Sequence, residues 1–278
     1  MRSLFASGFA VVIGVLPALA ADDDKWSTVK GKVVFDNSKH KIPTREFPPA
    51  AKGKDLPKCA ASDKEFLTED WVVNPKTKAV RDVFVWLAPE PTANEWQQLK
   101  GRKLKKFPSF KEEQLHPDLK AVAPNTVEMD QPCCRFIPHA LGVRVGQTVV
   151  VKNSASIAHN AHWFSQNNGE SNPLLGEGKQ AQFPVKEWER AEVKVLCDIH
   201  PWMSATIRVF DHPYYAVTNA DGEYEIKKAP VGKFRIFIWH REGAYSGKDE
   251  GRHGFELTIT PKVTEVKEYS VTLDEKPK

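Results

Sequence analysis

The segment Glu192–Phe210, EVKVLCDIHPWMSATIRVF, places Cys197, His200 and Met203 at intervals of three residues between two strand-like stretches. Pro201 lies inside this spacing and disfavours a helix, because proline breaks an interior helical turn. A regular strand would turn residues three apart toward opposite faces of a sheet. The pattern therefore predicts a tight loop between two strands, in which the three side chains can converge on one point.

A thiolate, an imidazole and a thioether form a soft ligand set, which favours copper. Zinc would accept the Cys and the His, but a Met ligand adds little for zinc. A blue-copper site requires a second imidazole, and the segment VVVKNSASIAHNAHWF, residues 149–164, offers two. In an extended segment His159 and His162 face opposite ways, so only one of them is expected to bind. The structural alternative is a Cys and a Met that pack in a sandwich core beside a surface His.

Two sequences, VGQTVVVKN…AHN (residues 145–160) and VLCDIHPWM (residues 195–203), resemble the cupredoxins. The Cys-x2-His-x2-Met spacing is similar to that of amicyanin, the short-loop member of that family. The resemblance covers residues 125–212 and implies a Greek-key β-sandwich that binds one type 1 copper ion. The copper ligands that the resemblance implies are His159, Cys197, His200 and, in the axial position, Met203.

The resemblance also implies roles for neighbours of these ligands. Asn160 resembles a position that steadies the Cys loop, and Pro201 and Trp202 would stiffen this loop and keep water from the metal. The edge of His200 is expected to be partly exposed and to be the point where an electron leaves. Four protein ligands leave no open position for a substrate, so the protein is not expected to be an enzyme. The family implies a redox protein partner such as a c-type cytochrome or a periplasmic dehydrogenase.

The rest of the chain is rich in strand-like segments, which predicts an all-β fold. These segments alternate apolar and polar residues or are enriched in Val and aromatic residues. The clearest are Ser27–Asp36, Ala79–Leu87, His139–Asn153 and Gly222–His240. Only Asn94–Leu99 and Phe110–Leu119 are expected to be helical.

A second resemblance is carried by AVTNADGEYEIKKAPVGKFRIFIWH, residues 216–240, with its Asp-Gly and Pro-Val-Gly turns. It resembles the carboxypeptidase regulatory-like, transthyretin-type β-sandwich. The opening strands of that family have counterparts near the N-terminus, in VKGKVVFD and VRDVFVWL. We therefore expect a discontinuous second small β-sandwich (27–97 and 213–278), a basic linker (98–124) and the inserted cupredoxin-like copper domain (125–212). The alternative is two domains in series, with the N-terminal strands joining the cupredoxin.

Residues 1–20 have a basic start, an apolar centre and an Ala-Leu-Ala end, which is the pattern of a secretory signal peptide. The apolar stretch is too short for a membrane span, so we expect a periplasmic or otherwise exported protein. A net charge of +4 with mixed signs gives no indication of nucleic acid as a partner. Among the four cysteines we expect one disulfide, from Cys59 to Cys134 or Cys133, with Cys197 left as a thiol.

The sequence thus favours an exported one-electron carrier whose copper site is made of two histidines, one cysteine and one methionine. One alternative is a protein that stores or presents copper without redox turnover. Another is a metal-free cell-envelope sandwich that serves binding or adhesion. No Ser/His/Asp arrangement, phosphate-binding loop or pair of carboxylates suggests a hydrolase or a transferase.

Overall fold

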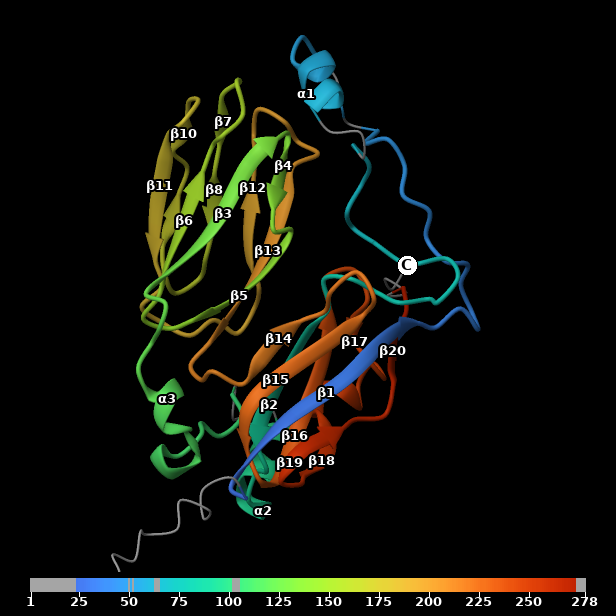
Figure 1. The fold of residues 1–278 in the computed structure, drawn as a ribbon, viewed down its shortest axis with the longest axis vertical. Coiled ribbons are helices and arrows are strands. Elements are labelled where there is room, and N and C mark those ends of the chain that lie inside the picture. Colours follow the sequence, from blue (N-terminus) through green and yellow to red (C-terminus); the bar gives the residue numbers. More distant parts are fainter. Residues whose placement is uncertain (1–23, 50, 52, 63–65, 102–105, 274–278) are drawn as a thin grey trace, which may run out of the picture.

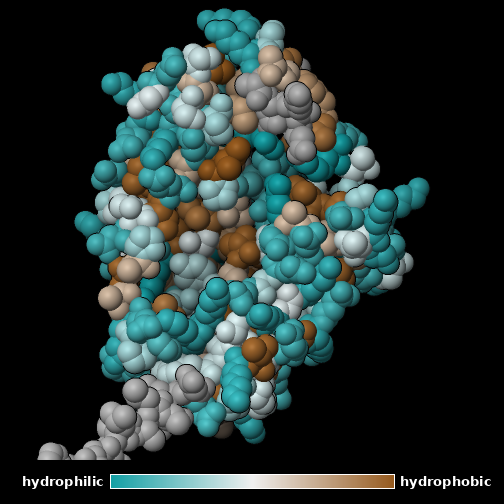
Figure 2. Space-filling model, in the orientation of Figure 1, coloured by the Kyte–Doolittle hydropathy of each residue, from teal (hydrophilic) through white to brown (hydrophobic). Residues whose placement is uncertain are grey.

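The computed structural model describes residues 24–273 with the exception of residues 50, 52, 63–65 and 102–105. The predicted signal peptide, residues 1–20, lies outside the described residues. Strands predominate, and they form two β-sandwiches, one above the other in Figure 1. This confirms the predicted all-β fold. On the face shown in Figure 2, apolar residues lie in a hollow about midway along the molecule, near the level where the two sandwiches meet.

The first sandwich contains the Cys-His-Met segment. One of its sheets has the strand order β11-β6-β3-β4, and the other has the order β5-β13-β12-β8-β9, while β7 and β10 form a separate pair. The bounds are β3 (Thr126–Cys133), β4 (Arg135–Ile137), β5 (Ala140–Arg144), β6 (Thr148–Lys152), β7 (His159–Asn160), β8 (His162–Phe164), β9 (Glu170–Ser171), β10 (Leu174–Leu175), β11 (Gln180–Pro184), β12 (Val193–Leu196) and β13 (Ser204–Phe210).

The second sandwich joins the two ends of the described chain. One sheet has the order β15-β1-β19, with β20 also paired to β1, and the other has the order β14-β2-β16-β17, with β18 paired to β16. The bounds are β1 (Trp26–Phe35), β2 (Phe84–Pro89), β14 (Tyr215–Val217), β15 (Glu223–Pro230), β16 (Gly232–His240), β17 (Ala244–Tyr245), β18 (Phe255–Ile259), β19 (Lys262–Glu265) and β20 (Tyr269–Val271).

The first sandwich contains two parallel strand pairs. β3 pairs with β6 in parallel. β13 pairs with β5 in parallel, which brings the last strand of this sandwich in sequence beside one of its early strands. β12 and β13 pair antiparallel, with Leu196 opposite Ser204. The loop of residues 197–203 therefore begins and ends at adjacent strands, and its two ends are fixed by the same ladder.

Each sandwich has its own apolar core. The first core contains Met129, Trp163 and Ile207, and the second contains Phe35, Leu87 and Ile236. A small third cluster, Phe84, Ala140 and Trp239, joins the two sandwiches. Burial of apolar area of this kind is the main favourable term in folding.

The predicted Asp-Gly turn holds the N-terminal strand to the second sandwich. Gly222 has φ +71°, a conformation that favours glycine. Its carbonyl accepts a hydrogen bond from the Val33 N–H at 2.8 Å, and a Cβ on Gly222 would collide with the Val33 carbonyl oxygen. Strand β1 pairs with β15, β19 and β20, and β2 pairs with β14 and β16, so the whole first sandwich lies between these partners in the sequence.

Helices are short and lie outside the sheets. They are α1 (Leu56–Ser62), α2 (Ala93–Lys100), η2 (Glu112–Gln114), α3 (Pro117–Lys120) and η3 (Gly251–His253). The helix predicted at 94–99 is confirmed as α2, whose Thr92 caps the N–H of Glu95. The helix predicted at 110–119 is wrong as a continuous element, because Pro117 begins a separate turn after η2. None of the helices in the described part of the chain has both the length and the apolar character that crossing a bilayer requires.

The described residues of the basic stretch 98–124 follow the surface of the second sandwich closely. Phe110, Leu115 and Leu119 pack against the second core. The Lys106 ammonium forms an ion pair with Asp211. This part of the chain is therefore bound to the sandwich and is not a freely solvated connector.

Candidate metal centre

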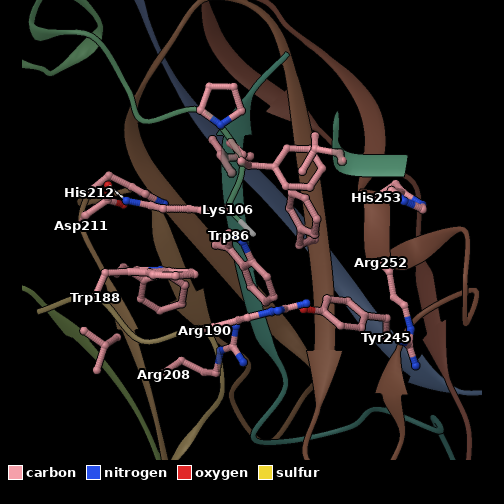
Figure 3. Close-up of a pocket in the computed structure, with 18 of the residues that line it drawn as sticks. Trp86, Lys106, Trp188, Arg190, Arg208, Asp211, His212, Tyr245, Arg252 and His253 are labelled. Atoms are coloured by element: carbon pink, nitrogen blue, oxygen red, sulfur yellow. Dashed lines mark hydrogen bonds and ion pairs between the residues drawn. The ribbon is translucent and has the colours of Figure 1, made fainter. Parts of the chain in front are cut away.

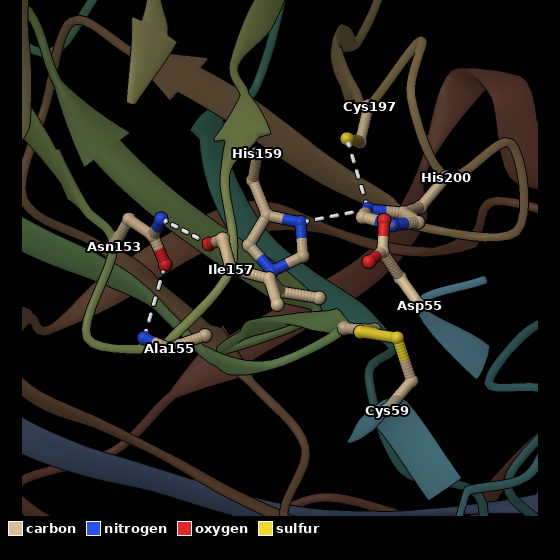
Figure 4. The surroundings of a disulfide bond; sticks show 9 residues. Asp55, Cys59, Asn153, Ala155, Ile157, His159, Cys197 and His200 are labelled. Atoms are coloured by element: carbon tan, nitrogen blue, oxygen red, sulfur yellow. Dashed lines mark hydrogen bonds and ion pairs between the residues drawn. A yellow bond between two sulfur atoms is a disulfide. The ribbon is translucent and has the colours of Figure 1, made fainter. Parts of the chain in front are cut away.

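The loop between β12 and β13 positions three of the predicted ligands. The Cys197 N–H donates to the Met203 carbonyl at 3.2 Å, and the Met203 N–H donates to the His200 carbonyl at 2.9 Å. These bonds close a compact turn, as the sequence spacing predicts. His159 reaches the same place from β7 (Figure 4).

The side chains of His159, Cys197 and His200 converge on one buried point. Their donor atoms all lie within 4.8 Å of one another. The two Nδ1 atoms are 2.9 Å apart, and Cys197 Sγ lies 3.9 Å from His200 Nδ1. Metal–nitrogen bonds of about 2.0 Å and metal–sulfur bonds of about 2.3 Å can span both separations from a single ion. The donor set therefore fits a metal ion without rearrangement of these two pairs.

His162 does not belong to this cluster. Its Nδ1 lies 3.1 Å from the Asp198 carboxylate, and its Nε2 lies 3.0 Å from Glu170. These two partners, with the hydrogen bond to Glu170 first, raise the pKa of His162. Of the two histidines that the sequence offered, the structure brings only His159 to the thiol.

Asn160 holds the Cys loop, in agreement with the predicted role. Its side-chain oxygen accepts hydrogen bonds from the Asp198 N–H at 2.8 Å and the Ile199 N–H at 3.3 Å. The same oxygen lies 3.3 Å from Cys197 Sγ. The Gln131 side chain in turn donates to the Asn160 carbonyl at 3.1 Å. Such outer contacts fix the orientation of ligands around a metal.

Burial governs the protonation of the cluster. It lowers the pKa of His159 to about 4, with the neighbouring His200 acting in the same direction. Burial also lowers the pKa of His200, while Asp55 opposes it. Both imidazoles are therefore neutral at pH 7, which is the form that binds metals. Burial raises the pKa of the Cys197 thiol, although backbone N–H groups of Asn160, His200 and Ile199 favour its thiolate.

Met203 and Trp202 form the apolar side of the loop. Met203 is buried in the first core. The Trp202 ring packs against His200, with 5.1 Å between ring centroids. The structure thus places Met203 beside the cluster in the same turn, with its backbone fixed by His200 and Cys197. Trp202 shields the imidazole, as the sequence predicted for a dry site.

A cap that the sequence did not predict covers His200. The short helix α1 carries Cys59, which is joined to Cys134 by a disulfide, and a nitrogen of His200 lies within 4.8 Å of both sulfurs (Figure 4). Asp55, next to this helix, places Oδ2 3.6 Å from His200 Nε2. The disulfide selects Cys134 from the two partners that the sequence left open.

The expected exposure of His200 is wrong. The residue is 2% exposed, because α1, the disulfide and Trp202 cover it. The sequence signal that could have revealed this cap is the pairing of Cys59 with a cysteine of the first sandwich. That pairing requires residues near 59 to lie against the sandwich and not in solvent.

Comparison with protein-family models gave no match, and neither did a sequence comparison with curated proteins.

Solved structures match part of the chain at low similarity. A purple cupredoxin from Nitrosopumilus maritimus is 23% identical with a TM-score of 0.26, and the match covers 30% of this chain and 99% of that one. A reduced amicyanin variant is 24% identical with a TM-score of 0.28, covering 32% and 86%. A copper-containing nitrite reductase from Thermus scotoductus SA-01 is 26% identical with a TM-score of 0.29, covering 35% of this chain and only 25% of the reductase.

Proposed function

We propose that the protein is an exported copper protein that carries single electrons through a type 1 site with one copper ion. The observation that carries this proposal is the convergence of His159, Cys197 and His200 in a buried turn held by Asn160. Met203 would supply the axial thioether. Copper bound by a thiolate and two imidazoles cycles between Cu(I) and Cu(II). The protein's part is to keep the donors fixed and dry in both states, and four protein ligands leave no place for a substrate.

The electron route we propose avoids direct exposure of His200. Three aromatic rings connect this residue to the surface, with centroid separations of 5.1 Å to Trp202, 5.9 Å from Trp202 to Phe66 and 5.4 Å from Phe66 to Phe47. Phe47 is 49% exposed. A redox partner such as a c-type cytochrome or a periplasmic dehydrogenase would then dock at Phe47.

Titration with Cu(II) tests the copper site. The metal-loaded protein should show an intense thiolate-to-copper charge-transfer band in the visible spectrum, and reduction by one electron should bleach it reversibly. Cys197→Ser should abolish the band. Cys133→Ser is the matched control, because Cys133 is also buried but is not in the cluster. A colourless protein, or a band that survives Cys197→Ser, would contradict the proposal and favour a metal-free binding or adhesion sandwich.

Copper storage or presentation without redox turnover is a second candidate, and the burial of His200 favours it. A ligand that is covered by a disulfide-held helix exchanges slowly with solvent and with partner proteins. Electron exchange between the loaded protein and a c-type cytochrome separates the two candidates. Exchange within seconds supports the carrier, and a coloured protein that does not exchange supports storage.

A further inference from the structure

A cavity of about 670 Å³ lies between the two sandwiches, away from the Cys-His-Met loop. Arg208 and Phe210 of β13 line it from the first sandwich, together with Trp188 and Arg190 of the segment before β12. From the second sandwich it is lined by Trp86, Phe237 and Tyr245 (Figure 3). Its volume lies within the range of pockets that bind small molecules, which occur preferentially between domains.

Arg208 is a buried cation that faces this cavity. The residue is 7% exposed, and its guanidinium lies 5.1 Å from the ring centroid of Trp86 and 4.9 Å from that of Trp239. Its Nε has no hydrogen-bond partner, while the rest of the guanidinium interacts favourably with the Tyr245 hydroxyl and with the Glu192 carboxylate. Burial of a charge is costly, and an anion in the cavity would offset part of the cost that these two partners leave.

The other charged residues of the cavity leave an excess of positive charge. Its lining contains five Lys and Arg residues and two Asp residues, a formal balance of 5 − 2 = +3. Lys106 pairs with Asp211, and Arg252 pairs with Asp249 at 3.6 Å. Three cations then remain without an ion pair among the described residues: Lys100, Arg190 and Arg208. Lys100 lies over the Trp96 ring, 5.7 Å from its centroid, so Arg190, at the rim, and Arg208 are the ones we assign to the anion.

The walls are aromatic on both sides. Trp86 stacks on Phe237 with 5.0 Å between centroids and 5° between planes, and it also contacts Phe210 at 5.8 Å. Trp188 contributes a ring from the opposite sandwich and carries the Lys106 ammonium 5.1 Å from its centroid. Flat apolar walls of this type suit a planar ring.

We propose that this cavity binds a small aromatic carboxylate, with its carboxylate on Arg208 and Arg190 and its ring between Trp86 and Trp188. Arginine is suited to this ligand because its planar guanidinium donates two parallel hydrogen bonds to a carboxylate. The site is separate from the proposed copper site and does not depend on it.

Isothermal titration calorimetry of the full chain with 2-naphthoate tests the proposal. We expect binding at millimolar concentration or below, and no binding of 2-naphthalenemethanol, which has the ring without the charge. Inorganic phosphate should bind more weakly than 2-naphthoate. No binding of 2-naphthoate, equal binding of the alcohol, or tighter binding of phosphate would overturn the proposal.

Variants locate the site. Arg190→Gln should weaken 2-naphthoate binding about tenfold, because a charge-assisted hydrogen bond is lost. Trp188→Ala should weaken it about threefold to fivefold. Arg235→Gln is the matched control, because this arginine lies on β16 but pairs with Glu90 outside the cavity lining. Arg190 and Trp188 lie at the rim, so these variants keep the test valid even if Arg208→Gln does not fold. Equal affinity in Arg190→Gln and the unmodified protein would overturn the assignment.

Discussion

Each sandwich buries histidines, but among the described residues only the first sandwich brings two imidazoles and a free thiol together. In the first sandwich His159 and His200 turn their Nδ1 atoms toward each other and toward the Cys197 thiol. In the second, His240 stacks on Trp71 with 4.0 Å between centroids, and its Nδ1 accepts the Glu242 N–H at 3.3 Å. The pKa is lowered by burial in both places, to about 4 for His159 and to about 3 for His240.

This difference shows that burial and a lowered pKa do not by themselves identify a site. A buried histidine whose nitrogen is met by its own backbone is part of the packing. In a candidate site, donor atoms from separate segments converge on one point and are not occupied by hydrogen bonds to the backbone. In the first sandwich β7 and the β12–β13 loop provide this convergence, and the described residues of the second sandwich contain no group of three such donors.

The largest expected difference between the two sandwiches is in their stabilisation by copper. A ligand at about 1,000 times its Kd adds about 4 kcal/mol to the stability of the fold that binds it. Hydrogen exchange should therefore slow in β6 and β12 on copper addition, with little change in β1 and β15. His159→Gln should remove this effect, and His240→Gln should keep it. Equal slowing in both sandwiches would show that the metal does not act through the first one alone.

Much of this contrast follows from the sequence, because it depends on local spacing. Pro201 and the three-residue intervals of Cys197, His200 and Met203 are enough to predict a loop between two strands. The alternation in β1 and the Asp221–Gly222 turn predict strands and their ends, since these patterns depend on a few adjacent residues. The choice of His159 over His162 needs long-range information, because it depends on where Asp198 and Glu170 lie.

The cap on His200 could not be predicted in the same way. Helix α1 has only seven residues, and the sequence LPKCAAS shows no apolar periodicity. Its position depends on the disulfide to Cys134, which is 75 residues away in the sequence. The cavity between the sandwiches could not be predicted either. In the sequence, Arg208 has the pattern of an outward-facing strand residue, and its burial depends on the position of the second sandwich.

Removal of the disulfide is expected to weaken the first sandwich selectively. The double variant Cys59→Ala/Cys134→Ala should lose about 2–4 kcal/mol of stability, because the unfolded chain gains freedom over a long loop. Urea unfolding measures this loss. The same variant should let diethyl pyrocarbonate modify His200, which is buried in the native protein. Cys133→Ala should do neither. If His200 stays protected in the double variant, α1 does not depend on the disulfide for its position.

The pH dependence of stability should report His240 in the second sandwich. Burial lowers its pKa from the ordinary value of 6.5 to about 3. Between pH 6.5 and pH 3, therefore, this imidazole is protonated in the unfolded chain but not in the folded protein. Stability is therefore fully present above pH 6.5 and is lost as the pH falls toward 3. At pH 5 the contribution of His240 to this loss of folding stability is about 2 kcal/mol. His159 and His212, whose pKa values are lowered to about 4, add to the same loss.

Urea unfolding of the metal-free protein at pH 7 and pH 5 measures this loss. In His240→Gln the difference between the two pH values should become smaller. His162→Gln is the opposite control, because the pKa of His162 is raised and its protonation on folding favours the native state at low pH. A loss that is unchanged in His240→Gln would mean that this imidazole takes up its proton in the folded state.

A smaller effect is expected from Asp55, beside the His200 ring of the first sandwich. Its carboxylate lies 3.6 Å from His200 Nε2, and a negative charge there favours Cu(II) over Cu(I). Asp55→Asn should raise the reduction potential of the loaded protein by about 59 mV or less, which is one tenfold change for a one-electron couple. Asp198→Asn should shift it less, because that carboxylate is more than half exposed. A lower potential in Asp55→Asn would contradict this electrostatic role.

The smallest expected effect concerns where electrons leave the first sandwich. Phe47→Lys should slow electron exchange with a c-type cytochrome a few-fold, which corresponds to about 1 kcal/mol at a docking surface. The absorption band and the reduction potential should not change, because two rings, Phe66 and Trp202, lie between Phe47 and His200. Ile199→Lys is the comparison, because Ile199 is 45% exposed and lies beside His200 in the loop itself. If Ile199→Lys slows exchange more than Phe47→Lys does, electrons leave through the ligand loop, and the cap only protects the metal.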